Sequence, residues 1–172
     1  MRTDTTHRLI LIRHAKTEPS AATDSERELT DRGERQSFAL GEMLEPVVRG
    51  TVHARVSSAV RAVQTWRLAA ARIAAEVTTE QVDALYTADA DDLLADVRAT
   101  GDAVDTVVIV GHNPTIAEVV DVLATGGIGS AYDDLRDGGY SPSTTAIFDV
   151  EGLWAETDST TAELVQYVPP QA

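Results

Sequence analysis

The chain carries a short run of branched apolar residues, Leu9 to Ile12, close to its N-terminus. A run without polar alternation predicts a strand buried on both faces, as in the centre of a parallel sheet. The run ends at Arg13 and His14, where the chain leaves the predicted sheet. Ligands of open α/β sheets bind at the carboxyl ends of the strands. This basic pair therefore either belongs to an anion site or lies in an ordinary surface loop.

Alternating strand and helix patterns continue along the rest of the chain. Further strands are predicted at 52–56, 81–86, 106–110, 145–150 and 164–168. Between them, helices are predicted from an N-cap at Thr30 to Pro46, from Arg61 to Val77, around 93–97, and from an Asn113 N-cap with Pro114 at the first position to Leu123.

The segments without a clear period are 18–29, predicted as a loop, and 126–140, predicted as a flap over a site. No internal repeat or linker divides the chain, so a single domain over residues 1–172 is expected. The alternation of strands and helices predicts an α/β fold, a three-layer α/β/α sandwich with a mostly parallel central sheet.

The acidic composition limits the partners. With 14 Lys and Arg against 28 Asp and Glu, the formal net charge is −14, which argues against binding to nucleic acid or to an anionic membrane. A phosphate-bearing substrate would also be repelled at long range, so a phosphate site requires a local group of Arg and His. The chain has no Cys, no apolar run near the roughly 18 residues of a bilayer span, and no signal-peptide pattern. A cytoplasmic location is expected, and the sequence does not determine the oligomeric state.

Basic side chains follow three of the predicted strands. Arg13 and His14 follow the first strand, Arg61 follows the second, and His112 follows the fourth. Because the strands of a parallel sheet share one carboxyl edge, these four side chains are predicted to meet. Their charges would repel one another unless an anion lay between them. Phosphoryl transfer requires such donors for the phosphate oxygens, together with a nucleophile in line.

The other histidines and the acidic residues have simpler interpretations than a second site or a metal centre. His7 and His53 lie in polar contexts and are interpreted as structural or surface residues. His112 alone could be a histidine satisfied at a strand end, although the helix-starting turn beside it presents backbone N–H groups. No HxxxH or HxxH pair is present, and the acidic stretch 89–92 lacks the glycine and final glutamate of a calcium loop. No metal and no cofactor are therefore expected.

Four segments in this order resemble the histidine phosphatase superfamily, which is also called phosphoglycerate-mutase-like. They are the strand and loop 11–15, with Ala15 where glycine is usual; the helix start 29–36, similar to LTxxGxxQ; the segment 57–65, similar to SxxxRAxQT; and the second-histidine turn 110–113. The compact length and the Leu85-Tyr86 pair before an acidic helix look most like the SixA-type phosphohistidine phosphatase branch.

The resemblance implies a phosphoglycerate-mutase-like fold and a metal-independent phosphatase. His14 would be the nucleophile and would form a phosphohistidine that water hydrolyses. Arg13 and Arg61 would bind the phosphoryl oxygens, and His112 would complete the pocket and stabilise the transition state. His14 must be neutral to attack, and the neighbouring guanidinium charges shift its pKa in that direction. The implied partner is a phosphorylated protein or a small phosphorylated metabolite. Two neighbours complete the set of expected substrate-binding residues: Lys16 and Asn113.

The general acid is the main departure from the family. Many members carry a glutamate after the third strand, and by the family resemblance Ala84 stands at that position here, with Asp83 beside it. Asp83 and Glu18 are candidate acids, as are Asp133 and Asp134 in the predicted flap. A leaving group such as an imidazole nitrogen or a phenol needs less protonation than an alkoxide. The missing glutamate therefore favours phosphohistidine or aryl phosphate over sugar phosphates.

The sequence is also compatible with two alternatives to a phosphatase. A cofactor-dependent phosphoglycerate-type mutase would, by family analogy, carry longer insertions and the acid glutamate. A non-catalytic phosphate-binding interaction module would retain the pocket without chemistry. Binding alone does not require a nucleophile in line, so the presence of both histidines and both arginines favours an enzyme.

Overall fold

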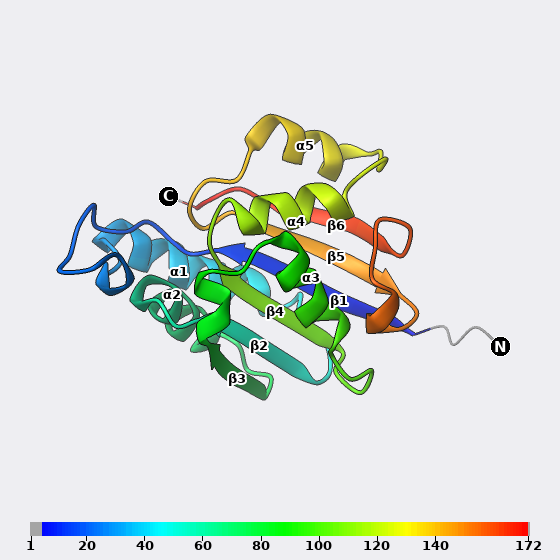
Figure 1. The fold of residues 1–172 in the computed structure, drawn as a ribbon, viewed down its shortest axis with the longest axis horizontal. Coiled ribbons are helices and arrows are strands. Elements are labelled where there is room, and N and C mark those ends of the chain that lie inside the picture. The colour runs from blue at the N-terminus through cyan, green and yellow to red at the C-terminus, as the bar shows by residue number, and fades with distance from the viewer. Residues whose placement is uncertain (1–4, 172) are drawn as a thin grey trace.

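The computed structural model describes residues 5–171, and these residues contain one six-stranded sheet (Figure 1). The strands are β1 (Thr6–Arg13), β2 (Val52–Ser57), β3 (Val77–Val82), β4 (Thr106–Gly111), β5 (Thr145–Glu151) and β6 (Ala162–Val168). Their order across the sheet is β3-β2-β4-β1-β5-β6. β1 to β4 run parallel to one another, whereas β5 pairs antiparallel with both β1 and β6. The mostly parallel sheet is confirmed, and the reversed β5 is its exception.

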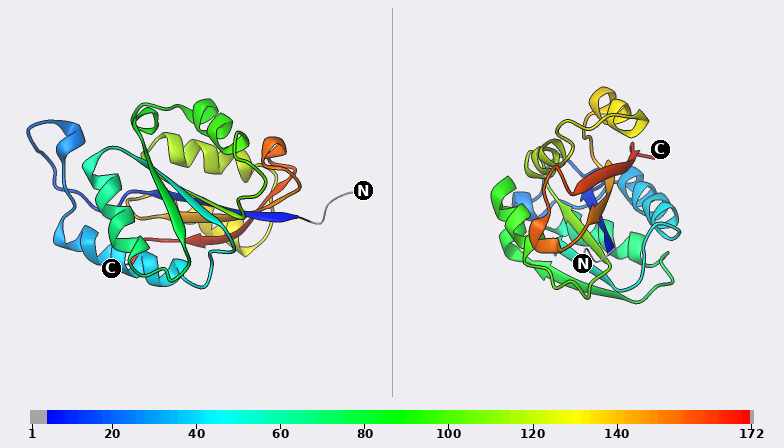
Figure 2. Two further views of the ribbon diagram at one scale, coloured as in Figure 1. Left: turned by 90° about the horizontal axis from the view of Figure 1, so that it is seen from below. Right: turned by 90° about the vertical axis from the view of Figure 1, so that its right-hand side faces the viewer.

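Helices cover both faces of the sheet, as the views in Figure 2 show. α1 (Asp31–Leu44) and α2 (Val60–Ala70) pack on one face. α3 (Ala90–Arg98), α4 (Thr115–Leu123) and α5 (Ser130–Gly138) pack on the other. Three short 3₁₀ helices, η1 (Asp24–Glu26), η2 (Asp83–Tyr86) and η3 (Trp154–Glu156), lie in the connections. The predicted three-layer α/β/α sandwich is therefore confirmed.

The first strand is buried on both faces, as its sequence predicts. Leu9 and Leu11 belong to the core beneath α3, α4 and α5, and Ile10 and Ile12 belong to the core beneath α1 and α2. All four side chains are fully buried. Alternate strand residues point to opposite faces, so a strand between two helical layers needs apolar side chains at every position.

α1 begins where the sequence predicts. The Thr30 hydroxyl accepts a hydrogen bond from the Gly33 N–H at 3.0 Å, and the helix ends before Pro46. Gly33 is required there because a Cβ atom would clash with the carbonyl group of Lys16. The helix start therefore lies directly against the loop that follows β1.

The predicted helix from Arg61 to Val77 is too long, and the strand after it is predicted too late. α2 ends at Ala70, and β3 occupies Val77–Val82 instead of 81–86. Ile73 falls on the helical period but is buried from a tight turn, in which its N–H bonds the Ala70 carbonyl. β3 is an edge strand with four exposed central residues, so it lacks the apolar pattern from which a strand is read.

The predicted flap is also wrong in part. Within 126–140 the chain forms α5, whose Tyr132 and Leu135 are buried in the core on the α3 and α4 face. The helix packs beside β6, and its apolar residues were too few for the sequence to show a helical period. Tyr140, which follows α5, contacts the residues described in the next subsection.

The α4 start departs from the prediction as well. Pro114 stands at the N-cap position, after a cis peptide bond, and Asn113 does not cap the helix. The Asn113 amide instead donates a hydrogen bond to the Tyr140 carbonyl at 2.7 Å. An asparagine before a helix start predicts a cap, but here a tertiary partner takes its side chain.

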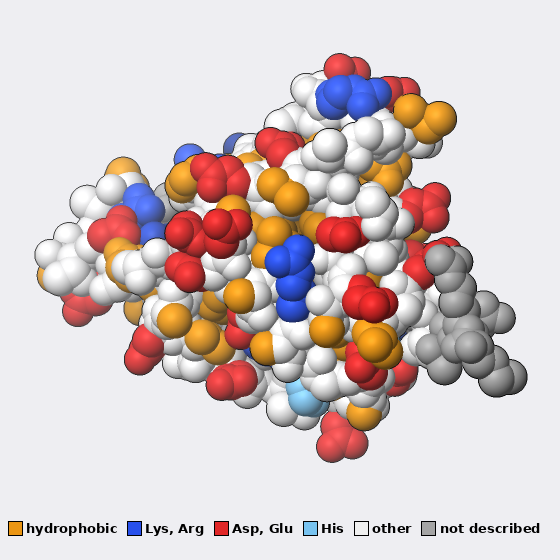
Figure 3. Space-filling model, turned by 45° about the vertical axis from the view of Figure 1, so that its right-hand side comes forward, with side chains coloured by type: hydrophobic (Ala, Val, Ile, Leu, Met, Phe, Trp, Pro, Cys, Tyr) orange, Lys and Arg blue, Asp and Glu red, His pale blue; other side chains and the backbone are white. Residues whose placement is uncertain are grey.

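Acidic side chains are spread over the face drawn in Figure 3, where Lys and Arg are few. This distribution agrees with the net charge of −14. Among the helices of residues 5–171, none is both long and apolar enough to cross a membrane.

Candidate active site

The carboxyl ends of three neighbouring parallel strands bring the predicted residues together. Arg13 ends β1, in register with Gly111 at the end of β4, so His14 and His112 leave the sheet side by side. Their ring centroids are 5.3 Å apart. Arg61 comes from the first turn of α2, which follows β2. The predicted convergence at this edge of the sheet is present.

The ring of His14 is held in one tautomer. Its Nδ1 lies 2.9 Å from the carbonyl oxygen of Ala15, and a carbonyl can only accept, so Nδ1 carries the hydrogen of the neutral ring. Nε2 therefore presents its lone pair, and the Arg61 Nε–H donates to it at 3.3 Å. Ala15 has a negative φ, so alanine in place of the usual glycine is tolerated without backbone strain.

The pKa of His14 is lowered to about 3. Burial of the ring is the largest cause, and the charges of His112, Arg61 and Arg13 lower the pKa further. The hydrogen bond to the Ala15 carbonyl acts in the opposite direction. His14 is therefore neutral at physiological pH, as a nitrogen nucleophile must be.

Thr65 ties the His14 loop to the helix that carries Arg61. Its hydroxyl accepts a hydrogen bond from the Ala15 N–H at 3.0 Å and donates to the Arg61 carbonyl at 2.7 Å. Thr65 is fully buried, and the exposed fraction of Arg61 is only 5%. Thr65 thus links the backbone of the loop after His14 to the backbone of the helical turn that carries Arg61.

Asp24, in η1, occupies the outer face of the Arg61 guanidinium. Its carbonyl oxygen accepts from Nη1 of Arg61 at 2.8 Å, and its Oδ2 accepts from Nη2 at 3.0 Å. The Tyr86 hydroxyl donates to the same Oδ2 at 2.5 Å. The Tyr86 hydrogen bond and Arg61 lower the pKa of Asp24, and the same bond raises the pKa of Tyr86.

Neither Asp24 nor Tyr86 was singled out from the sequence. Asp24 lies in the aperiodic segment 18–29, and only the folded chain places it on Arg61. Arg27, one turn later, brings its Nε within 3.1 Å of Asp24 Oδ1 and adds to the positive charge near His112. For Tyr86, the only sequence signal is the Leu85-Tyr86 pair of the family resemblance, which does not predict its contact with Asp24.

His112 is held from the opposite side by Ser57, the last residue of β2. Its Nε2 lies 2.7 Å from Ser57 Oγ, and its ring is nearly perpendicular to that of Tyr86, with the ring centroids 5.5 Å apart. Its Nδ1 is buried and has no partner among the described residues. The pKa of His112 is lowered to about 4, by burial first and then by Arg61, while Asp24 acts to raise it.

The Tyr140 carbonyl connects two further predicted residues. It accepts from Nη1 of Arg13 at 3.1 Å and from the Asn113 amide at 2.7 Å. The Tyr140 hydroxyl donates to the Leu11 carbonyl at 2.7 Å, which anchors the connection to β1. Burial and Arg61 lower the pKa of Arg13. Asn113 is therefore at the site, with its amide nitrogen used to hold the turn.

The remaining candidates lie on the surface. Lys16, Glu18 and Asp83 are exposed, and the structure records no side-chain hydrogen bond or ion pair for them within residues 5–171. Asp133 forms an ion pair with Arg136 on α5, and no contact joins it to the imidazoles within residues 5–171. In the same part of the chain, no three His, Asp or Glu side chains come together in a way that could hold a metal ion.

Comparisons with known proteins agree with this fold. The family model of the histidine phosphatase superfamily, branch 1, matches residues 9–86. An uncharacterised protein of Mycobacterium leprae is 31% identical over 165 residues, which cover 93% of this chain and 100% of that protein. A SixA-type structure from Nakamurella multipartitia, assigned as a phosphohistidine phosphatase, has a TM-score of 0.84 and 30% identity, with both chains covered completely.

A further solved structure, the protein histidine phosphatase SixA complexed with tungstate, has a TM-score of 0.75. It is 20% identical over 95% of this chain and 97% of that one, a likeness of fold alone. The chain belongs to the histidine phosphatase superfamily. Within that superfamily it is a SixA-like member of branch 1.

The lowered pKa values of the two imidazoles predict a loss of stability in acid. The unfolded chain takes up protons on these histidines near the ordinary value of 6.5, whereas folded His14 and His112 do so only near 3 and 4. The free energy of unfolding should therefore fall as the pH decreases below about 6.5, by at most about 1.4 kcal/mol per pH unit for each histidine.

Urea unfolding at about pH 7 and about pH 5 measures this dependence. The matched comparison is the double variant His14→Gln, His112→Gln, which keeps every carboxylate and should show a shallower loss. Equal slopes in the two proteins would show that these histidines titrate normally in the folded state.

Proposed function

We propose that this protein is a metal-independent phosphatase that works through a phosphohistidine on His14. The observation that carries the proposal is the convergence of two imidazoles and two guanidiniums at one strand edge, with the lone pair of His14 Nε2 held on the inner side. The guanidiniums supply the positive charge that a transferring phosphoryl group requires.

The first half-reaction transfers the phosphoryl group to the enzyme. Arg13 and Arg61 bind the phosphoryl oxygens, and the substrate displaces or shares the Asp24 contacts to Nη1 and Nη2 of Arg61. His14 Nε2 then attacks phosphorus, an N–P bond forms, and the bond to the leaving group breaks with its electron pair on the leaving atom. His112 stabilises the charge that develops on the phosphoryl oxygens.

The second half-reaction returns the enzyme to its starting state. Water attacks the phosphorus of phosphorylated His14 and gives up a proton to the solvent, and the N–P bond breaks with its electron pair returning to Nε2. Inorganic phosphate leaves, and the hydrogen bond to the Ala15 carbonyl keeps the proton of His14 on Nδ1 through both steps. Nε2 of His14 is thereby free for the next attack.

The substrate class follows from the groups beside the pocket. Asp24 is held ionised by Arg61 and Tyr86, and the Tyr86 proton is committed to Asp24, so neither group is a ready acid at neutral pH. Asp83 and Glu18 stay candidate acids from the exposed rim. The arrangement favours leaving groups that need little protonation, which are the imidazole of a phosphohistidine in a protein and the phenol of an aryl phosphate.

Turnover in the presence of a chelator tests the proposal. We expect hydrolysis of p-nitrophenyl phosphate without added metal, and a kcat/KM for a phosphohistidine peptide well above that for 3-phosphoglycerate. A preference for 3-phosphoglycerate would contradict the substrate class, and its conversion to 2-phosphoglycerate would identify a mutase. Binding of vanadate without turnover of any phosphorylated substrate would identify a phosphate-binding module.

A further inference from the structure

Ser57 has only one place to donate its hydroxyl hydrogen. The exposed fraction of its side chain is 0%, so water does not reach it. Within the described residues, Oγ has two hydrogen-bond partners, the Ala59 N–H at 3.3 Å and His112 Nε2 at 2.7 Å. The Ala59 amide can only donate, so the single acceptor for the Ser57 hydrogen is Nε2.

This donation decides where His112 carries its own hydrogen. A neutral imidazole has one N–H and one lone pair, and its lowered pKa, about 4, makes His112 neutral near pH 7. With Nε2 accepting from Ser57, the hydrogen must lie on Nδ1. The opposite tautomer would leave a buried serine O–H without an acceptor, which costs free energy.

Nδ1 is also the nitrogen that the fold leaves without a partner. It is buried and makes no hydrogen bond in the described part of the chain. The Nε of Arg13 is likewise buried and has no partner among the described residues, and Arg13 pairs with Gly111, the residue before His112. Buried polar groups are normally hydrogen-bonded, so donors left open on residues that frame one site indicate a ligand with acceptor atoms.

The two imidazoles are therefore held in the same tautomer for opposite purposes. The Ala15 carbonyl holds the hydrogen of His14 on Nδ1 so that Nε2 offers a lone pair. The Ser57 hydroxyl holds the hydrogen of His112 on Nδ1 so that Nδ1 offers a donor. A lone pair from His112 would instead repel a phosphoryl oxygen.

We propose that Ser57 is a positioning residue that sets the tautomer of His112, so that His112 donates a hydrogen bond from Nδ1 to the transferring phosphoryl group. The part concerning phosphoryl transfer rests on the proposed phosphatase activity. The part concerning the tautomer rests on the hydrogen bonds of the free protein alone.

Long-range ¹H–¹⁵N correlation spectra of the imidazole rings test the tautomer directly. In the unliganded wild-type protein near pH 7, we expect the His112 signals of a protonated Nδ1 and an unprotonated Nε2. In Ser57→Ala, the tautomer protonated at Nε2 should become populated. A wild-type spectrum with the hydrogen on Nε2, or an unchanged tautomer in Ser57→Ala, would overturn the proposal without any activity measurement.

Kinetics test the consequence for catalysis. Ser57→Ala should lower kcat/KM about tenfold and weaken vanadate binding in parallel, less than the roughly 100-fold or larger loss caused by removing a transition-state donor altogether. Ser57→Thr keeps the hydroxyl and should restore most of the activity. The adjacent Ser58→Ala removes a half-buried hydroxyl that makes no hydrogen bond within residues 5–171; it is the matched control and should stay close to wild type.

The outcomes separate this proposal from the proposed function. A shifted tautomer with unchanged kcat/KM and unchanged vanadate binding would contradict donation to the phosphoryl group. If the wild-type protein hydrolysed no phosphorylated substrate, the proposed phosphatase activity would fail, while the spectra would still decide whether Ser57 sets the tautomer of His112.

Discussion

Replacing His14 with asparagine is expected to lower kcat/KM by at least about 10⁴-fold, because the variant has no nitrogen lone pair able to form the N–P bond. Asparagine preserves a polar side chain of similar reach in a nearly buried position, where the exposed fraction of the histidine is 5%. Loss of activity with an unchanged unfolding transition would therefore report on chemistry and not on folding. Hydrolysis of p-nitrophenyl phosphate measures the effect.

The control for His14→Asn is His53→Asn on β2. His53 is half-buried, and it takes part in none of the hydrogen bonds at the strand edge. The control variant should retain near-wild-type kcat/KM. Rapid acid-free quenching with labelled substrate should also trap a phosphorylated wild-type protein and an unlabelled His14→Asn protein. Turnover that survives the His14 substitution would show that another group is the nucleophile.

The parts of the site that the sequence predicts are those governed by sheet geometry. Arg13, His14 and His112 lie at or just after the carboxyl ends of buried strands, and parallel strands share a carboxyl edge, so their meeting follows from the pattern of apolar runs. Arg61 is predicted for the same reason, since α2 begins at that edge. The positions of the core strands can be predicted equally well, because a strand that is buried on both faces must be apolar at nearly every residue.

The parts that were missed depend on tertiary contacts without a local signal. Asp24 sits in a polar loop, and its contact to Arg61 joins residues 37 positions apart. α5 is a short helix with two buried residues, too few to show a period. β5 has the apolar residues of a buried strand, but its direction follows from the path of the preceding connection. Patterns of hydrophobicity identify such strands without orienting them.

The carboxylate of Asp24, which binds Arg61, helps to explain how a protein with net charge −14 can keep a phosphate pocket. Without a ligand, two guanidiniums and two imidazoles lie close together, and the pKa values of Arg13, His14 and His112 are all lowered in part by these neighbours. The Asp24 carboxylate offsets part of that repulsion and leaves its own side chain largely exposed. A phosphoryl group carrying more negative charge can then replace it on Arg61.

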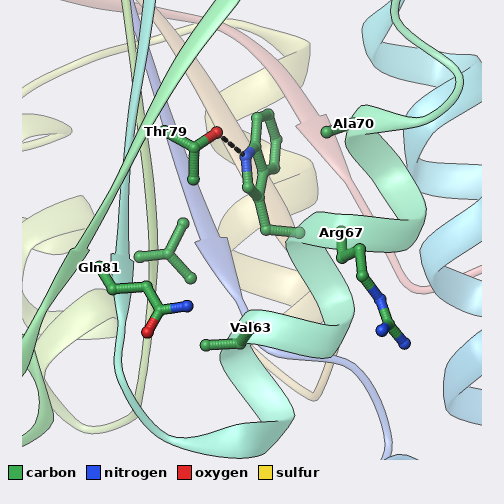
Figure 4. A pocket seen from close by; sticks show the side chains of 7 residues that line it. Val63, Arg67, Ala70, Thr79 and Gln81 are labelled. Atoms are coloured by element: carbon green, nitrogen blue, oxygen red, sulfur yellow. Dashed lines mark hydrogen bonds between the residues drawn. The ribbon is translucent and has the colours of Figure 1, made fainter.

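The largest expected effect on stability comes from Trp66 of α2. The exposed fraction of its indole ring is 2%, and its Nε1 donates to the Thr79 hydroxyl of β3 at 2.9 Å. Trp66→Ala is expected to lower the free energy of unfolding by about 3 kcal/mol, at the lower end of the roughly 3–5 kcal/mol range for buried aromatic residues. The lower end is expected because a hollow of about 370 Å³ lies beside the ring, lined by Val63, Ala70 and Gln81 among others (Figure 4). Through this hollow, water and neighbouring side chains can enter the space that the indole leaves.

Trp66→Phe is the intermediate variant. It keeps one aromatic ring but removes the N–H and the smaller ring of the indole, and the exposed Thr79 hydroxyl can bond to water instead, so a loss of about 1–2 kcal/mol, smaller than that of Trp66→Ala, is expected. Leu153→Ala, at a half-exposed residue far along the chain, should change stability by no more than about 0.5 kcal/mol. Urea unfolding measures all three variants. If Trp66→Ala lost no more stability than Leu153→Ala, the packing of α2 against the β3 edge of the sheet could not be as the structure has it, and the placement of Arg61 at the first turn of the same helix would need to be reconsidered.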